Sequence, residues 1–190
     1  MSEDHALVQD ILAGRTERFA ELVQRQQKLV WHLVYRLVGH PDDARELCQD
    51  VFLRVYRCLH QFRADSSLAT WIGRIAYSIA ARHLQKRRIA LTSIDADSDD
   101  EGRVRESGHE ADFDLQAAYA DAEIMAHVSA AIECLPPLQR TLVSLYHLEE
   151  LGVAEIAQIT ELPVGTVKNY LFRARRTLKA QLQKRLGELA

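Results

Sequence analysis

A strongly acidic segment divides the chain into two blocks. Residues 89–124 hold 2 Lys and Arg against 11 Asp and Glu, a sum of −9, whereas residues 1–88 (14 against 10) sum to +4 and residues 125–190 (8 against 6) to +2. The acidic segment has few large apolar side chains, so it buries too little surface to offset the entropy lost on ordering. We therefore expect two small domains, residues 1–89 and 121–190, joined by a flexible acidic linker over residues 90–120.

Both blocks show the periodicity of amphipathic helices. In residues 43–59 the apolar side chains recur at intervals of three and four, which places them on one stripe of a helix. These side chains are Ala44, Leu47, Cys48, Val51, Phe52, Val55 and Leu59. No useful length alternates with the two-residue period of a strand, and the low counts of 8 Gly and 4 Pro disfavour turn-rich β folds. The sequence predicts an all-α fold.

Capping and helix-terminating residues set the limits of the other helices in the first block. A helix over residues 19–38 is expected to end at Gly39, and Pro41 suits the first turn of the next helix. Ser66 or Ser67 can cap a later helix in which Trp71 lies on the apolar stripe and belongs to the core. Cations are favourable at a helix C-terminus, so that helix is expected to finish in three of them: Lys86, Arg87 and Arg88.

The second block has the pattern of a helix-turn-helix unit. Helices over residues 126–135 and 138–148 are separated by a Pro-Pro pair, and two further helices follow. The core positions of the unit are filled by Ile156, Ala157, Leu162, Val167 and Tyr170. From Lys168 to Gly187 there are seven basic residues and no acidic one. Such a helix has the charge to enter the DNA major groove, although a solvated basic face on an ordinary bundle is the plainer interpretation.

Two segments resemble a known family. The string EIA(x)5PVGTVKNYLFRARRTL is similar to the fourth conserved region of bacterial RNA polymerase sigma factors of the extracytoplasmic-function class, and the segments DDARELCQDVFLRVYRCLHQF and TWIGRIAYSIA resemble their second conserved region. The resemblance implies an alternative sigma factor that binds core RNA polymerase, directs it to promoters and helps to open the DNA. It also implies control by an anti-sigma factor held between the two domains.

The resemblance assigns three sets of contact residues. For the coiled coil of the largest catalytic polymerase subunit, which together with the flap forms the expected docking site on the polymerase, they are Asp43, Glu46, Gln49, Asp50 and Arg54. For the minus-ten element they are Phe62, Arg63, Arg74, Tyr77, Ser78 and Arg82. For the minus-thirty-five element they are Thr166, Lys168, Asn169, Phe172, Arg173 and Arg175. Aromatic rings would stack on bases, and cations would track one backbone or read guanine.

Four positions depart from the usual residues of the family, and at two of them Asn169-Tyr170 stands where relatives often have Ser-Arg. Ser78 stands where relatives commonly have Asn, so the identity of the flipped minus-ten base is open. Tyr170 removes a cation that relatives often carry. Glu161 replaces a glycine of the turn and puts an anion near the duplex.

Other kinds of site fail on spacing. The three cysteines, Cys48, Cys58 and Cys134, form no C-x-x-C pair and read as small buried hydrophobes. An acidic run that begins at Asp95 imitates a calcium loop, but Asp100 stands where the loop requires glycine. We expect no metal, no cofactor and no catalysis.

No apolar run approaches the ~18–20 residues that cross a bilayer, and the start is acidic, so we expect a cytoplasmic protein without membrane insertion.

Two other classes of function stay open. A stand-alone helix-turn-helix repressor or activator would bind duplex DNA without polymerase. An interaction module would use the face at residues 43–54 and never contact DNA. The sums of +4 and +2 for the two blocks are small for tight autonomous DNA binding, which favours the sigma factor.

Overall fold

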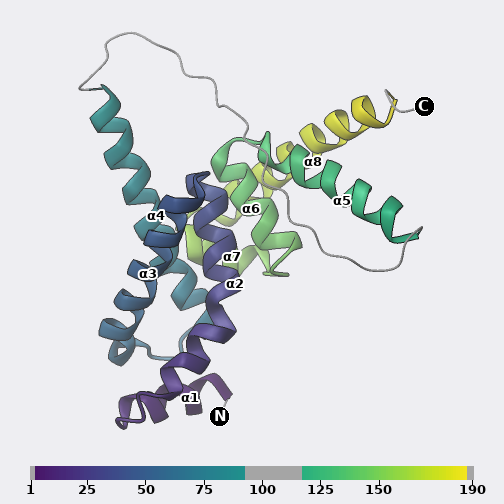
Figure 1. Ribbon diagram of the computed structural model, residues 1–190. Helices are drawn as coiled ribbons and strands as arrows, with labels where there is room; N and C mark the ends of the chain where they lie inside the picture. Colours follow the sequence, from purple (N-terminus) through teal and green to yellow (C-terminus); the bar gives the residue numbers. More distant parts are fainter. Residues whose placement is uncertain (1–2, 93–116, 188–190) are drawn as a thin grey trace.

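The computed structural model describes residues 3–92 and 117–187. Within these ranges the chain forms eight α-helices and one short 3-10 helix, and no β-strand (Figure 1). The elements are α1 (Glu3–Leu12), α2 (Arg18–Val38), α3 (Pro41–Cys58), the 3-10 helix η1 (Leu59–Gln61), α4 (Leu68–Thr92), α5 (Ala117–Glu133), α6 (Pro137–His147), α7 (Val153–Thr160) and α8 (Val164–Gly187). The prediction of an all-α fold is confirmed.

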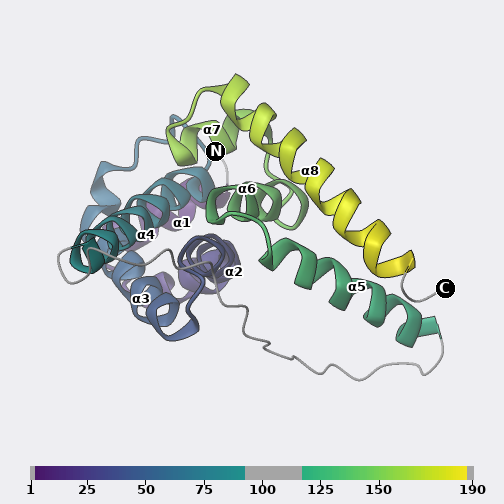
Figure 2. The ribbon, with the colours of Figure 1, turned by 90° about the horizontal axis from the view of Figure 1, so that it is seen from above.

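Helix α2 lies at the centre of the arrangement. It contacts α1, α3 and α4 of its own block and also α6 of the second block, and Figure 2 shows it end-on between them. Its buried apolar side chains recur with helical spacing: Leu22, Leu29, Val30, Leu33, Val34 and Leu37. The helix ends as predicted at Gly39, whose φ of 77° is left-handed and whose N–H donates to the carbonyl of Tyr35 at 2.8 Å. Glycine adopts this conformation without steric cost, so the chain can turn sharply into α3.

Helices α3 and α4 complete the first block. The predicted stripe of α3 is buried at Ala44, Leu47, Val51 and Val55. At the start of α4, the hydroxyl of Ser67 accepts a hydrogen bond from the N–H of Thr70 at 3.1 Å, so Ser67 is the N-cap. The predicted end of α4 at its three cations was wrong, because the helix runs on to Thr92. Cations stabilise a last turn but do not stop a helix, and the residues that follow, Ile-Ala-Leu-Thr, contain no glycine or proline.

A polar joint connects the two blocks between α2 and α6. Arg140 of α6 is only 9% exposed, and its Nε donates to the carbonyl of Arg36 on α2 at 2.6 Å. The Nη1 of Arg140 donates to the carboxylate of Glu133 at 2.9 Å, and Glu133 also pairs with the side chain of Arg36. His32 of α2 contacts Glu149 after α6. The hydrophobic core is continuous through both blocks, from Leu7 to Ala174.

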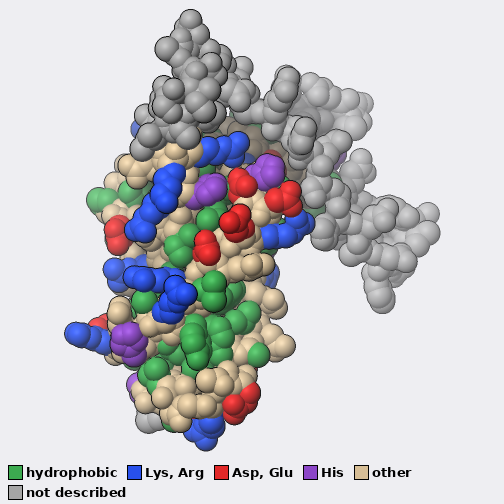
Figure 3. Space-filling model, turned by 60° about the vertical axis from the view of Figure 1, so that its left-hand side comes forward, with side chains coloured by type: hydrophobic (Ala, Val, Ile, Leu, Met, Phe, Trp, Pro, Cys, Tyr) green, Lys and Arg blue, Asp and Glu red, His purple; other side chains and the backbone are tan. Residues whose placement is uncertain are grey.

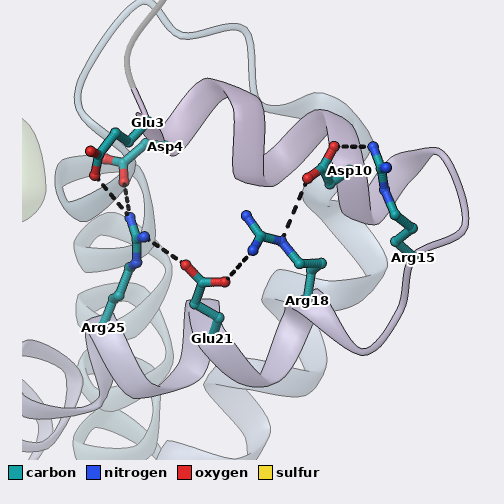
Figure 4. Close-up of polar contacts among 7 residues, drawn as sticks. All are labelled: Glu3, Asp4, Asp10, Arg15, Arg18, Glu21 and Arg25. Carbon is teal, nitrogen blue, oxygen red and sulfur yellow. Dashed lines mark hydrogen bonds and ion pairs between the residues drawn. The ribbon is translucent and has the colours of Figure 1, made fainter.

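Helix α1 was not predicted from the sequence. It buries Leu7, Val8 and Ile11, and it is tied to α2 by a chain of ion pairs (Figure 4). Arg18 bridges Asp10 at 3.5 Å and Glu21 at 2.7 Å, and Arg25 bridges Glu21 at 2.6 Å with the first turn of α1. The network consists of Glu3, Asp4, Asp10, Arg15, Arg18, Glu21 and Arg25.

The predicted linker falls mostly outside the described residues. Helix α4 ends at Thr92 and α5 begins at Ala117, so each helix extends a few residues into the range of 90–120. The acidic run that begins at Asp95 also lies outside the described residues. In the second block, α5 and α8 contact each other and run side by side (Figure 2).

Candidate nucleic-acid interface

The outer face of α3 gathers most of the residues expected to contact the polymerase. Glu46, Gln49, Asp50 and Arg54 are all exposed, because the opposite stripe of the helix is buried in the core. Two apolar side chains that the sequence analysis did not select, Leu53 and Tyr56, are 55% and 48% exposed on the same helix. Figure 3 shows charged and exposed hydrophobic side chains together on the side of the molecule where α3 and α4 lie.

Asp43 does not join this outer face. Its carboxylate lies 3.5 Å from Nε2 of His83 and 3.7 Å from Nη1 of Arg87, both on α4, and 3.8 Å from Nδ1 of His40. The side chain is therefore directed to α4 and connects the two helices. This contact was not predictable from local sequence patterns, since His83 is forty residues away.

The loop before α4 carries the first of the expected minus-ten residues. Phe62 is half-buried and packs against Trp71, with ring centroids 5.6 Å apart and planes tilted by 59°. Trp71 is itself partly buried against the core. Arg63 is exposed, and the following Ala64 has a φ of 58°, a left-handed conformation that places a bend in the loop.

The expected minus-ten residues on α4 divide into two groups. Arg74, Ser78 and Arg82 follow one another at four-residue spacing and are exposed. Tyr77 is half-buried, and burial raises its pKa, with further contributions from the nearby Glu161 and Tyr170. Arg74 also lies close to the second block, with Nη2 3.7 Å from Oε1 of Glu161.

Helices α7 and α8 form the predicted helix-turn-helix unit. Ile156 and Ile159 of α7 and Val167 of α8 are buried, and Leu171 and Ala174 continue the buried stripe of α8. At the start of α7 the carboxylate of Glu155 accepts a hydrogen bond from the N–H of Gly152 at 2.9 Å. The helix ends at Thr160, and the capping residue after it, Glu161, has a left-handed conformation with a φ of 58° and a ψ of 24°. A glycine would adopt this conformation without strain, so Glu161 holds the turn at some cost.

The outer face of α8 presents the expected minus-thirty-five residues. Lys168, Asn169 and Arg173 are exposed, and Phe172 is 67% exposed, the largest fraction among the exposed large hydrophobic side chains of the described residues. Thr166 is half-buried in the first turn. This face combines cations, an amide and an aromatic ring, which are the groups that bind phosphates and read base edges.

Arg175 has a different environment. Its guanidinium carbon lies 5.0 Å from the ring centroid of Tyr146 on α6, a cation–π contact that joins the two helices. The side chain is exposed and could reach a phosphate only by leaving this ring.

Among the described residues, the cysteines and the acidic groups form no further site. Cys58 is buried, and burial raises the pKa of the half-buried Cys48 to about 11. Cys134 is exposed, so its assignment to the core was wrong; it follows the last turn of α5, where the chain turns toward Pro136. Residues 3–92 and 117–187 contain no group of three or more His, Cys, Asp or Glu side chains placed to hold a metal ion. None of the described helices has the length and apolar character to span a membrane.

Comparisons with known proteins agree with this geometry. Residues 22–89 match the family model of sigma-70 region 2, and residues 127–178 match that of sigma-70 region 4. The chain is 34% identical to the RNA polymerase sigma-H factor of Pseudomonas aeruginosa over 189 residues, 98% of this chain and 97% of that protein. It is 34% identical to the ECF RNA polymerase sigma-E factor of Escherichia coli K12 over 186 residues, 95% of this chain and 94% of that protein.

Two solved structures share the fold. The sigma factor RpoE of Bartonella quintana, in complex with the anti-sigma factor NepR, matches with a TM-score of 0.67 at 20% identity, covering 87% of this chain and 96% of that one. CnrH, in complex with the cytosolic domain of CnrY, matches with a TM-score of 0.65 at 21% identity, covering 96% and 99%.

The fold and its surfaces define an all-helical DNA-binding protein with a helix-turn-helix unit. The chain belongs to the extracytoplasmic-function class of sigma-70 family factors, the transcription initiation factors that direct core RNA polymerase to promoters.

Proposed function

We propose that the outer face of α3 is the docking surface for core RNA polymerase. Glu46, Gln49, Asp50 and Arg54 supply a polar, mixed-charge surface, and Leu53 and Tyr56 supply apolar area beside it. An apolar centre with a polar rim is the usual composition of a specific protein interface. A coiled coil with complementary charges, such as that of the largest catalytic subunit, fits such a helix face, and the polymerase flap would receive the second block.

The loop at residues 62–68 and the exposed side of α4 are proposed to bind the minus-ten element. Arg63, Arg74 and Arg82 would follow the phosphates of one strand, while Ser78 would lie beside the flipped base. Tyr77 and Phe62 would offer rings for stacking, although both are half-buried in the free protein. Phe62 would have to turn away from Trp71 to receive a base.

The outer face of α8 is proposed to bind the minus-thirty-five element. Lys168, Asn169, Phe172 and Arg173 stand together near the N-terminal half of the helix, which is the part that reaches base edges when a helix enters the major groove. Thr166 would bind phosphate at the start of the helix, as would Arg175 after leaving Tyr146. This exposed face is the single observation on which the proposed promoter contacts depend most.

These surfaces assign a separate role to each part of the chain. Residues 1–89 would bind polymerase and the minus-ten element, residues 121–190 would bind the minus-thirty-five element, and residues 90–120 would join them. The chain would act in the cytoplasm, where polymerase meets the chromosome, and would supply recognition while the polymerase carries out nucleotide addition. We further propose control by an anti-sigma factor, because the structure of RpoE with a similar fold is a complex with one.

Run-off transcription tests this function. Purified core polymerase, with and without the chain, would transcribe a library of promoter fragments, and sequencing of the transcript ends would locate the starts. We expect start sites that require the chain and share two sequence elements. A promoter recovered in this way should be shifted on a gel only when core polymerase is present. An equal shift by the chain alone would favour a stand-alone regulator, and no chain-dependent start would contradict the proposal.

A further inference from the structure

One face of α4 is directed at the helix-turn-helix unit. Thr70, Gly73, Arg74 and Tyr77 stand at positions i, i+3, i+4 and i+7 of the helix, so they share one stripe. This stripe meets α7 and the turn after it, and α7 lies beside α4 in Figures 1 and 2. Two of the four residues, Arg74 and Tyr77, belong to the surface proposed for the minus-ten strand.

The contact is closest at Gly73. A Cβ atom at this position would lie 2.9 Å from Cδ1 of Ile159 on α7, a distance that real Cβ atoms essentially never show, and 3.0 Å from Cγ1 of the same residue. Ile159 is 1% exposed, and Gly73 is buried as well. One turn earlier on α4, the hydroxyl of Thr70 lies 3.5 Å from the carboxylate of Glu155, which is on α7 like Ile159. The absence of a side chain at Gly73 therefore lets the two helices approach.

The turn after α7 contacts the next part of the stripe. Glu161 places its carboxylate 3.7 Å from Nη2 of Arg74. Tyr77 lies near Glu161 and Tyr170, which contribute to its raised pKa after the larger effect of burial. Ser78 and Arg82, farther along α4, stay exposed. The turn thus contacts Arg74 and Tyr77 of the proposed minus-ten surface, although Arg74 keeps an exposed side chain, and leaves the other part of that surface open.

We propose that the free protein is closed at this contact, with the carboxylate of Glu161 in the place of a DNA phosphate on Arg74. Promoter binding then requires the turn to leave α4, and the closed contact competes with the minus-ten strand. This inference rests on the proposed function, because the role of α4 in minus-ten binding is itself proposed. The ion pair is exposed on both sides and so weak that DNA can displace it, while Ile159 and the joint between α2 and α6 hold the blocks together.

Disulfide trapping tests the closed state without polymerase. The test variant carries Gly73→Cys and Ile159→Cys, and the second substitution also removes the side-chain atoms of Ile159 that crowd residue 73. A third substitution, Cys134→Ser, removes the exposed native thiol. The ideal Cβ of residue 73 lies within 3.6 Å of three side-chain atoms of Ile159, so the two cysteines meet the separation of about 3.5–4.5 Å between Cβ atoms in a disulfide. We expect rapid and nearly complete crosslinking in the full-length free chain under mild oxidation, read on a non-reducing gel.

Controls make this trapping decisive. Each variant that carries only one of the two introduced cysteines, treated in the same way, should give no intramolecular crosslink. Crosslinking of the pair no faster than in the urea-unfolded chain would overturn the closed state. Circular dichroism of the reduced pair would establish that it is folded.

Transcription with the trapped protein tests the competition. On a promoter recovered by the run-off screen, the oxidised pair should lose at least tenfold in activity, and reduction should restore it. Equal activity of the two forms would overturn the inference. Inactivity of both forms, and of the unaltered chain, would instead contradict the proposed function, whereas the trapping rate would still decide whether the free chain is closed.

The chain offers a matched control for the carboxylate of Glu161. Glu150 is also an exposed glutamate in a left-handed conformation, with a φ of 53°, and it follows α6 rather than α7. In the trapping background, Glu161→Asn should slow crosslinking about twofold to fivefold, the size expected for an exposed ion pair. Glu150→Asn also removes one negative charge from a residue in the left-handed conformation, and it should leave the rate of crosslinking unchanged. Equal rates for the two variants would show that Glu161 has no role in closure.

Discussion

The guanidinium of Arg175 lies over the ring of Tyr146, 5.0 Å from its centroid, and this contact fastens the recognition helix α8 to α6. The same ring meets His147 edge-on, with centroids 4.9 Å apart. A residue expected to bind DNA is therefore part of the packing in the free protein, and its positive charge affects a neighbouring titratable group.

His147 should report this contact through its pKa. Burial lowers the pKa of His147 below its ordinary value of 6.5, and the charge of Arg175 adds to the effect. Because the folded protein favours the neutral imidazole, the contribution to stability is complete above pH 6.5 and is lost as the pH falls through the lower folded pKa. Arg175→Ala should raise the pKa without restoring it fully, since burial is the larger cause. An NMR titration of the imidazole measures the pKa of His147 in the unaltered chain and in Arg175→Ala, and the signal that is lost in His147→Asn assigns the resonance. An unchanged pKa in Arg175→Ala would contradict the contact.

Arg140 should be important for stability. Its side chain is buried and donates to the backbone of Arg36 and to Glu133, so Arg140→Met leaves a carboxylate and carbonyl groups without this partner. Breaking a buried pair by removing one member costs about 3–5 kcal/mol of unfolding free energy. Urea unfolding followed by circular dichroism measures it. Arg45→Met, which removes an exposed ion pair with Asp42, should change the free energy by less than about 0.5 kcal/mol.

Ser67 should stabilise the start of α4. Its hydroxyl accepts from the N–H of Thr70 at 3.1 Å and lies 2.8 Å from the hydroxyl of the same residue. Ser67→Ala should lower the free energy of unfolding by about 1 kcal/mol, the usual effect of losing an N-cap. Ser66→Ala is the matched control, because Ser66 makes only a 3.4 Å contact to the carbonyl of Ser67. Equal losses in the two variants would argue against the cap.

The features that were predictable from the sequence are those that depend on near neighbours along the chain. The stripe of α3, the cap at Ser67, the glycine that ends α2 and the buried residues of α7 and α8 all follow from helical periodicity and local hydrogen bonding. The charged faces of α3 and α8 could be located in the same way. Each of these features is complete within a few turns of one helix.

The features that were missed depend on residues far apart in the sequence. Asp43 is drawn to α4 by His83 and Arg87, and Arg175 is held by Tyr146, so neither has the fully outward direction that its own helix would suggest. Helix α1 is short, and ion pairs with Arg18 and Arg25 of α2 support it. The approach of α7 to Gly73 depends on the packing of both blocks together.

Glu46 tests the docking surface on α3. Glu46→Lys reverses a charge on the exposed face, so it should weaken binding to core polymerase about tenfold or more while leaving the helical circular dichroism unchanged. Glu17→Lys reverses an exposed charge outside α3 and should have little effect on binding. Co-purification or a binding assay with core polymerase gives the comparison, and undiminished holoenzyme formation by Glu46→Lys would refute the role of this face.

Arg173 tests the recognition helix. The residue is exposed on the outer face of α8 beside Phe172 and Asn169, where a guanidinium can bond to O6 and N7 of guanine. Arg173→Ala should reduce discrimination among minus-thirty-five sequences by about 1–3 kcal/mol. Lys179→Ala removes an exposed cation farther along the same helix and should leave the order of preferred sequences unchanged. Holoenzyme binding to a library randomised in the minus-thirty-five element, followed by sequencing, measures both. If Arg173→Ala keeps the sequence preference of the unaltered chain, the base contact assigned to Arg173 is wrong.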